Sequence, residues 1–117
     1  MPDTLITVVE TTPFTRRADK ILTTEEKKDL IDFLAANPLM GEEIVGTGGV
    51  RKVRFGSHGR GKSGGVRAIY YYYDDNMPLF ALLVYGKGEQ SNLTPDQKRV
   101  VTTLAATLKA QQTRRDK

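Results

Sequence analysis

The chain has 117 residues, a length that fits one domain, and carries 18 Lys and Arg against 14 Asp and Glu, for a formal net charge of +4 at pH 7. It has no cysteine, which excludes disulfide bonds, thiolate nucleophiles and cysteine-based zinc sites and is usual in a reducing compartment. Because its longest apolar run, residues 79–85, cannot span a bilayer and residues 1–7 do not resemble a signal peptide, we expect one domain over residues 1–117 in the bacterial cytoplasm, without membrane contact.

The first third of the chain predicts a strand and two helices. Residues 5–10 are rich in β-branched and apolar side chains, which favours a strand. A threonine followed by proline then predicts a short helix over residues 12–20. Residues 23–26 have the spacing of a capping box, which begins a second helix, and the Asn-Pro pair at 37–38 ends it.

The rest of the chain predicts three strands and a last helix. The strands cover residues 50–55, 66–73 and 79–85, and the third is apolar on both faces, which is typical of a central strand covered on both sides. A second capping signal at residues 94–97 begins the last helix, and we expect the polar tail to fray from about residue 111. This order predicts an α+β domain with helices covering one face of a sheet.

Positive charge is concentrated in one part of the chain. Between residues 50 and 73 there are six basic side chains and no acidic one: Arg51, Lys52, Arg54, Arg60, Lys62 and Arg67. A block of one sign gives a local positive field that suits a polyanion such as nucleic acid. The alternative interpretation is a surface loop whose charges serve solubility.

Three of these cations fall on predicted strands. Lys52 and Arg54 are two residues apart, so both project from the same face, and a rigid strand holds a phosphate better than a loop does. Arg67 begins the next strand, and its planar guanidinium could stabilise the extra negative charge of a pentacoordinate phosphate. Alternatively, Arg67 is a surface residue whose stem packs on its neighbours.

A glycine-rich segment separates these two strands. The letters GSHGRGKS at residues 56–63 match a phosphate-binding loop, but that loop must lead into a helix and a strand follows here, which argues against nucleotide hydrolysis. Arg60 and Lys62 then resemble a flexible cationic arm. His58 is the single histidine, which excludes a two-histidine acid/base pair and a multi-histidine metal site. It is either one proton-transfer group or a solvated side chain.

Aromatic side chains follow the cations. Tyrosines at 70–73 alternate between the two faces of a strand and could stack on bases, although we favour packing in the core. Tyr85 ends the last strand beside a Gly-Lys-Gly sequence, where we expect a reactive group to remain accessible.

The ordered motifs GTGGVRKVRFGSHGRGKSGGVRAIYYYYDD and LLVYGKGEQSNLTPDQ resemble the RelE/HigB-like toxins of bacterial toxin–antitoxin pairs, over residues 5–108. The resemblance implies a small domain with a curved, mostly antiparallel sheet, two N-terminal helices and a C-terminal helix. It also implies a ribosome-dependent endoribonuclease that cuts messenger RNA in the A site. The ribose 2′-OH attacks the adjacent phosphorus without a metal or other cofactor.

The same resemblance implies which residues form the site. Five residues are expected to form the catalytic set: Lys52, Arg54, Arg67, Tyr85 and Lys87. Arg51, Arg60, Lys62 and His58 are expected to bind RNA. Several relatives have an arginine where this chain has Gly88, and some have a tyrosine near Thr94, so the general acid and base are open among Tyr85, Lys87 and His58.

The expected partners are messenger RNA, the ribosome and a cognate antitoxin, often one with a helix-turn-helix. The antitoxin could cover the basic face, or dock elsewhere, for example on the second helix around residues 30–34, which we favour. Two other functions stay open: a non-catalytic RNA-binding or ribosome-docking module, and a protein whose basic groove mainly receives the antitoxin.

Overall fold

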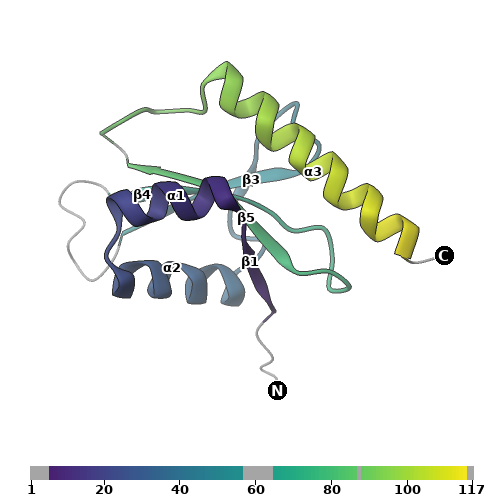
Figure 1. Cartoon of the computed structure of the whole chain (residues 1–117), viewed down its shortest axis with the longest axis horizontal. Helices are drawn as coiled ribbons and strands as arrows, with labels where there is room; N and C mark the ends of the chain where they lie inside the picture. The colour runs from purple at the N-terminus through teal and green to yellow at the C-terminus, as the bar shows by residue number, and fades with distance from the viewer. Residues whose placement is uncertain (1–5, 57–64, 87, 116–117) are drawn as a thin grey trace.

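The structure, a computed structural model, describes residues 6–56, 65–86 and 88–115 (Figure 1). Within these ranges the elements follow in the order β1 (Val8–Glu10), α1 (Thr12–Ile21), α2 (Thr24–Ala36), β2 (Glu42–Glu43), β3 (Val50–Phe55), β4 (Val66–Tyr71), β5 (Leu79–Gly86) and α3 (Pro95–Arg115). The strands form one sheet in the order β1-β5-β4-β3-β2, in which only the β1–β5 pair of these described strands is parallel. The predicted α+β class is confirmed.

Local signals in the sequence begin and end the helices. The α2 capping box forms as predicted: the Glu26 amide donates to the Thr23 hydroxyl at 3.0 Å, and the Thr23 amide donates to the Glu26 carboxylate at 2.8 Å. Thr94 and Gln97 make the same reciprocal pair at the start of α3, at 3.1 and 2.9 Å. The Asn37 side chain donates to the Phe33 carbonyl at the end of α2.

The helices α1 and α2 cover one face of the sheet (Figure 1). Phe14 of α1 and both Leu30 and Leu34 of α2 have no exposed surface and pack on β3, β4 and β5. Their burial follows from helical spacing, which puts residues four apart on one side of a helix. This face is therefore closed by a continuous apolar core.

The opposite face is covered by α3, so the prediction of helices on one face only is wrong. Val101 and Ala105 of α3 pack against the sheet residues Val50, Ile69 and Leu83. The apolar run of β5 is buried on both faces, as predicted, although β5 is second in the sheet and β4 is central. Apolar side chains on both sides of β5 need a layer on each side, and α3 supplies the second layer.

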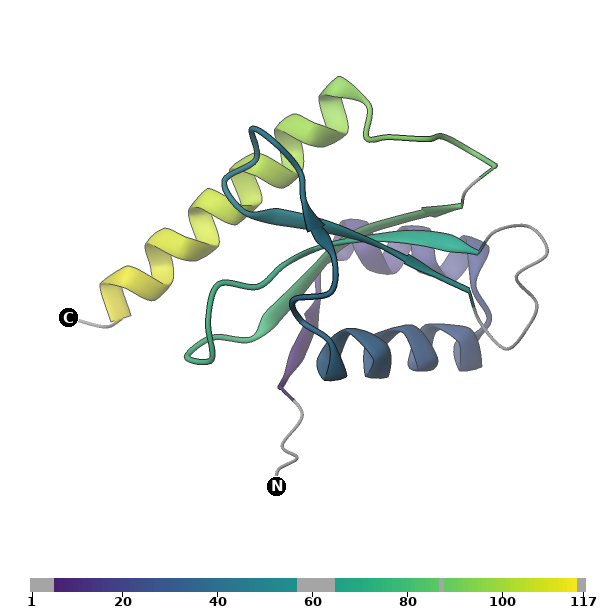
Figure 2. The same cartoon turned by 180° about the vertical axis from the view of Figure 1, so that it is seen from behind.

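On the second face of the sheet, the single helix α3 leaves part of the strands uncovered. Figure 2 shows α3 passing near the β2–β3 side, while the C-terminal ends of β3 and β5 and the start of β4 extend beyond it. The helix α3 continues to Arg115 and Gln112 is 8% exposed, and fraying of the tail from about residue 111 stays a prediction. Among the described helices, none is both long and apolar enough to cross a membrane.

Candidate functional site

Three side chains of the predicted site form a row across neighbouring strands. Arg54 of β3 is the register partner of Arg67 of β4, and Arg67 is the partner of Tyr85 of β5. Lys52 lies two residues before Arg54 and shares its face. The four residues, which we call the cationic row, thus share the α3 side of the sheet, and Arg54, Arg67 and Tyr85 lie near the ends of their strands.

The members of the cationic row differ in exposure. Arg54 is exposed and Arg67 and Lys52 are half-buried, so the guanidinium and ammonium groups can meet a ligand from solvent. Two guanidinium groups on directly paired residues repel each other unless an anion lies between them. The site is therefore suited to a group with more than one negative charge or hydrogen-bond acceptor, such as a phosphate.

Tyr85 is buried at the end of the row, which corrects the expectation that it stays accessible. Its side chain is 1% exposed, and its hydroxyl approaches the Ser91 carbonyl at 3.4 Å. Burial raises the pKa of Tyr85, while the positive charge of Arg67 lowers it. Since the net direction is upward from 10.0, the phenol keeps its proton at neutral pH.

Arg51 does not join the row. Strand alternation turns it to the face of its register partner Tyr70. Its guanidinium donates to the Gly41 carbonyl at 2.6 Å and pairs with the Glu43 carboxylate at 3.6 Å. These contacts hold the β2 edge against β3, and the RNA-binding role expected for Arg51 stays a prediction.

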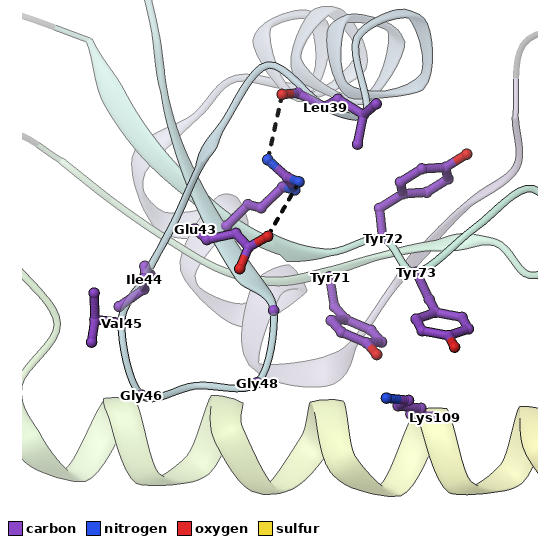
Figure 3. Close-up of a pocket in the computed structure, with 12 residues that line it drawn as sticks. Leu39, Glu43, Ile44, Val45, Gly46, Gly48, Tyr71, Tyr72, Tyr73 and Lys109 are labelled. Atoms are coloured by element: carbon purple, nitrogen blue, oxygen red, sulfur yellow. Dashed lines mark hydrogen bonds and ion pairs between the residues drawn. The ribbon is translucent and has the colours of Figure 1, made fainter.

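Figure 3 shows a cavity of about 460 Å³ that Arg51 lines and to which no residue of the cationic row contributes. Tyr71, Tyr72 and Tyr73 line it together with Lys109 of α3, whose ammonium lies 5.0 Å from the centre of the Tyr73 ring. The ion pair and the carbonyl contact of Arg51 close one side of it.

The tyrosine run is mostly structural, as we favoured. Tyr70 and Tyr71 are almost fully buried, on opposite faces of the sheet. The Tyr70 hydroxyl donates to the Pro38 carbonyl and accepts from the Gly41 amide. Tyr72 donates to Asp75, a hydrogen bond that raises the pKa of Tyr72 to about 12, and Tyr73 is 48% exposed.

Four residues of the predicted site lie outside the described residues: His58, Arg60, Lys62 and Lys87. Within the described part of the chain, no cluster of three or more His, Asp or Glu side chains could hold a metal ion.

The sequence analysis missed two polar residues next to the row. Asn92 accepts a hydrogen bond from the Lys52 ammonium at 3.2 Å, across 40 residues of sequence. Lys98 of α3 lines the same cavity as Lys52. A signal for Lys98 was present, because it lies three residues before Val101 and so belongs to the sheet-facing side of its helix. Asn92 lies before the helix and gave no comparable signal.

Comparisons with known proteins identify a family and a similar fold. Residues 10–115 match the family model described as the RelE toxin of the RelE/RelB toxin–antitoxin system. Among solved structures, the chain is similar to a mutant of the E. coli toxin RelE in the free state, with a TM-score of 0.54 and 20% identity, over 75% of this chain and 88% of that one. At this identity the likeness concerns the fold.

Proposed function

Since the chain belongs to the family of RelE toxins of RelE/RelB toxin–antitoxin systems, we propose that it is an endoribonuclease that cleaves messenger RNA in the ribosomal A site. The observation that carries this proposal is the cationic row. Arg54 and Arg67 are fixed opposite each other on paired strands, with Lys52 beside them on the same open face. Cations held by a sheet are preorganised, so little reorganisation is needed when charge develops on a bound phosphate.

The reaction suited to such a row is transfer of a phosphodiester within RNA. The ribose 2′-hydroxyl gives up its proton to a base as its oxygen forms a bond to the adjacent phosphorus, the bond from phosphorus to the 5′-oxygen breaks, and the leaving 5′-oxygen takes up a proton from an acid. The products are a 2′,3′-cyclic phosphate and a 5′-hydroxyl. Arg67 and Arg54 stabilise the additional negative charge of the pentacoordinate phosphorus, and Lys52 orients the substrate.

The burial of Tyr85 argues against a role for its hydroxyl in proton transfer. A buried phenol that keeps its proton is a poor base, and its position beside Arg67 fits a positioning role for that guanidinium. Lys87 and His58 remain the proposed proton donors and acceptors, and Arg60 and Lys62 the proposed RNA contacts. With so weak an acid/base set, we expect the ribosome to supply substrate alignment and therefore to be required.

The cognate antitoxin is the proposed regulatory partner, and a helix-turn-helix in it is part of the proposal. Docking on the second helix around residues 30–34 stays the favoured alternative; because Leu30 and Leu34 are fully buried, the contacts there would come from the outer side of α2. The choice between cover of the cationic row and docking elsewhere is testable. A double change of Lys52→Glu and Arg54→Glu, with the fold intact, weakens the complex in calorimetry only if the antitoxin covers the row.

The decisive experiment incubates the purified protein with naked RNA and with ribosomes programmed with the same messenger, and maps 5′ ends and terminal phosphates. We expect metal-independent cuts in the A-site codon only with ribosomes, with cyclic phosphate products. Arg67→Ala should abolish them while Arg99→Ala, on the exposed side of α3, should not. Binding to ribosomes without cleavage would instead identify a non-catalytic docking module.

A further inference from the structure

A second polar cavity adjoins the cationic row. It has a volume of about 260 Å³ and lies between the β2–β3 turn, β3 and the segment that enters α3. Three apolar side chains and three polar ones line it: Ile44, Val45 and Leu93, with Lys52, Asn92 and Lys98. Among these described lining residues none is acidic, so the lining combines an apolar wall with two ammonium groups.

Each polar group of this cavity is positioned by a neighbour. The Lys52 ammonium donates to the Asn92 side-chain oxygen at 3.2 Å, so the amide nitrogen of Asn92 is left to donate elsewhere. The Lys98 ammonium lies over Gly46, where an added Cβ would come within 3.3 Å of it. Gly46 has φ +82°, a conformation that glycine adopts without strain. A side chain at Gly46 would therefore crowd the ammonium of Lys98.

The cavity and the cationic row share Lys52. Lys52 and Arg54 lie about 6.6 Å apart along their strand, because a strand rises about 3.3 Å per residue. That separation is on the scale of neighbouring phosphates in an extended RNA strand. A strand whose scissile phosphate lies on Arg54 and Arg67 would thus place its next nucleotide at the cavity.

We propose that this cavity is a nucleotide subsite, in which Lys98 binds a phosphate flanking the scissile one and Asn92 donates to the edge of the adjoining base. The apolar wall covers the base, as in pockets where a few polar groups orient a mainly apolar ligand surface. The inference rests on the proposed function and adds two residues to it. Because the Asn92 oxygen is bound to Lys52, the subsite favours a base edge that presents an acceptor.

The test pairs a protein change with a change in the messenger. Single-turnover cleavage is measured on programmed ribosomes against toxin concentration, with the messenger unmodified or with an uncharged methylphosphonate at either linkage flanking the scissile one. Lys98→Ala should raise the half-saturating concentration by roughly three- to tenfold and leave the saturated rate near wild type. At one of the two linkages, the methylphosphonate and Lys98→Ala remove the same contact. When they are combined there, the half-saturating concentration should rise no further than it does with either change alone.

Arg99→Ala is the matched control, because it removes the adjacent cation of the same helix, which is exposed and paired with Asp96. Its effect should be small and should add to that of either methylphosphonate. Lys98→Ala that behaves like Arg99→Ala, or additivity at both linkages, overturns the subsite while Arg67-dependent cleavage still supports the proposed function. Absence of cleavage by the wild type overturns both.

Discussion

Both faces of the sheet are built mainly from β3, β4 and β5, but one face is closed by apolar packing and the other is partly open to a ligand. Under α1 and α2, the strand residues are mainly apolar, with Arg51 at the start of β3 as a charged exception, and two helices cover them. On the other face a single helix covers Ile69, while Arg67, two residues away on the same strand, remains within reach of solvent. The number of covering helices thus decides how much of each face is core and how much is available to a ligand.

The comparison explains why stability and activity should separate in this protein. The covered face contributes through area removed from water, which depends on packing and not on charge. The open end of the other face carries two arginines on directly paired residues, and their mutual repulsion falls when an anion binds between them. Substitutions on the face under α1 and α2 should therefore change the free energy of unfolding, and substitutions at the open end of the other face should change the cleavage rate.

The largest expected effect is on the covered face. Phe14→Ala removes a fully buried ring beneath α1 and should lower the free energy of unfolding by about 3–5 kcal/mol. Denaturant unfolding measures this, with Phe14→Leu as a milder variant if the first does not fold. The control is Val100→Ala on α3, 49% exposed, which should cost no more than about 0.5 kcal/mol. Equal losses in both variants would contradict the distinction between the faces.

A slightly smaller effect, in catalysis and not in stability, is expected on the open face. Arg67→Ala should remove about 2.7–4 kcal/mol of transition-state stabilisation, because a preorganised donor to the developing charge is lost. Single-turnover cleavage at saturating ribosome measures it, and Arg99→Ala is the control. Unfolding should change little. A drop in the unfolding midpoint large enough to explain the lost activity would remove Arg67 from the catalytic set.

The third prediction concerns the face under α1 and α2, where the Tyr70 side chain bonds to the segment that precedes β2. Tyr70→Phe deletes a buried hydroxyl that accepts from the Gly41 amide at 2.8 Å, and so leaves that donor unpaired. We expect a loss of about 1–3 kcal/mol in the free energy of unfolding. Tyr73→Phe, whose ring is 48% exposed, should be close to neutral. Identical unfolding curves for both variants would show that the Tyr70 bonds contribute little.

The smallest expected effect depends on pH. Hydrogen bonds from Arg17 and from the Gly86 amide lower the pKa of Glu89 below its ordinary 4.5, and they tie α1 to the turn after β5. Because the folded pKa is the lower one, this stabilisation is complete above about pH 4.5 and disappears as the pH falls through the folded value.

Glu89→Gln should therefore reduce stability at pH 7 by less than about 1 kcal/mol, as for a partly exposed ion pair, and flatten the loss on acidification. Urea unfolding at neutral and acid pH measures the difference. Glu42→Gln, at an exposed position of β2, is the control. If acid weakens the Glu89→Gln variant as much as the wild type, the carboxylate does not make this contribution.

The sequence by itself determined the features whose partners are close in the chain. The capping boxes of α2 and α3 form because each needs only a hydroxyl and a side chain three residues later. The alternation of a strand put Lys52 and Arg54 on one face, whereas the contacts that hold Arg51 on the other face were not predicted. The order of the elements was enough to indicate the α+β class.

Only the tertiary structure decided which residues far apart in the sequence come into contact. The register that sets Arg67 opposite Arg54 depends on how β3 and β4 pair, and the burial of Tyr85 depends on the segment that returns over it. Asn92 bonds to Lys52, and Lys98 lines the same cavity, because α3 packs on the second face of the sheet. Such contacts are fixed by the joint packing of several elements, which no local pattern encodes, whereas a cap is fixed by hydrogen bonds within one helical turn.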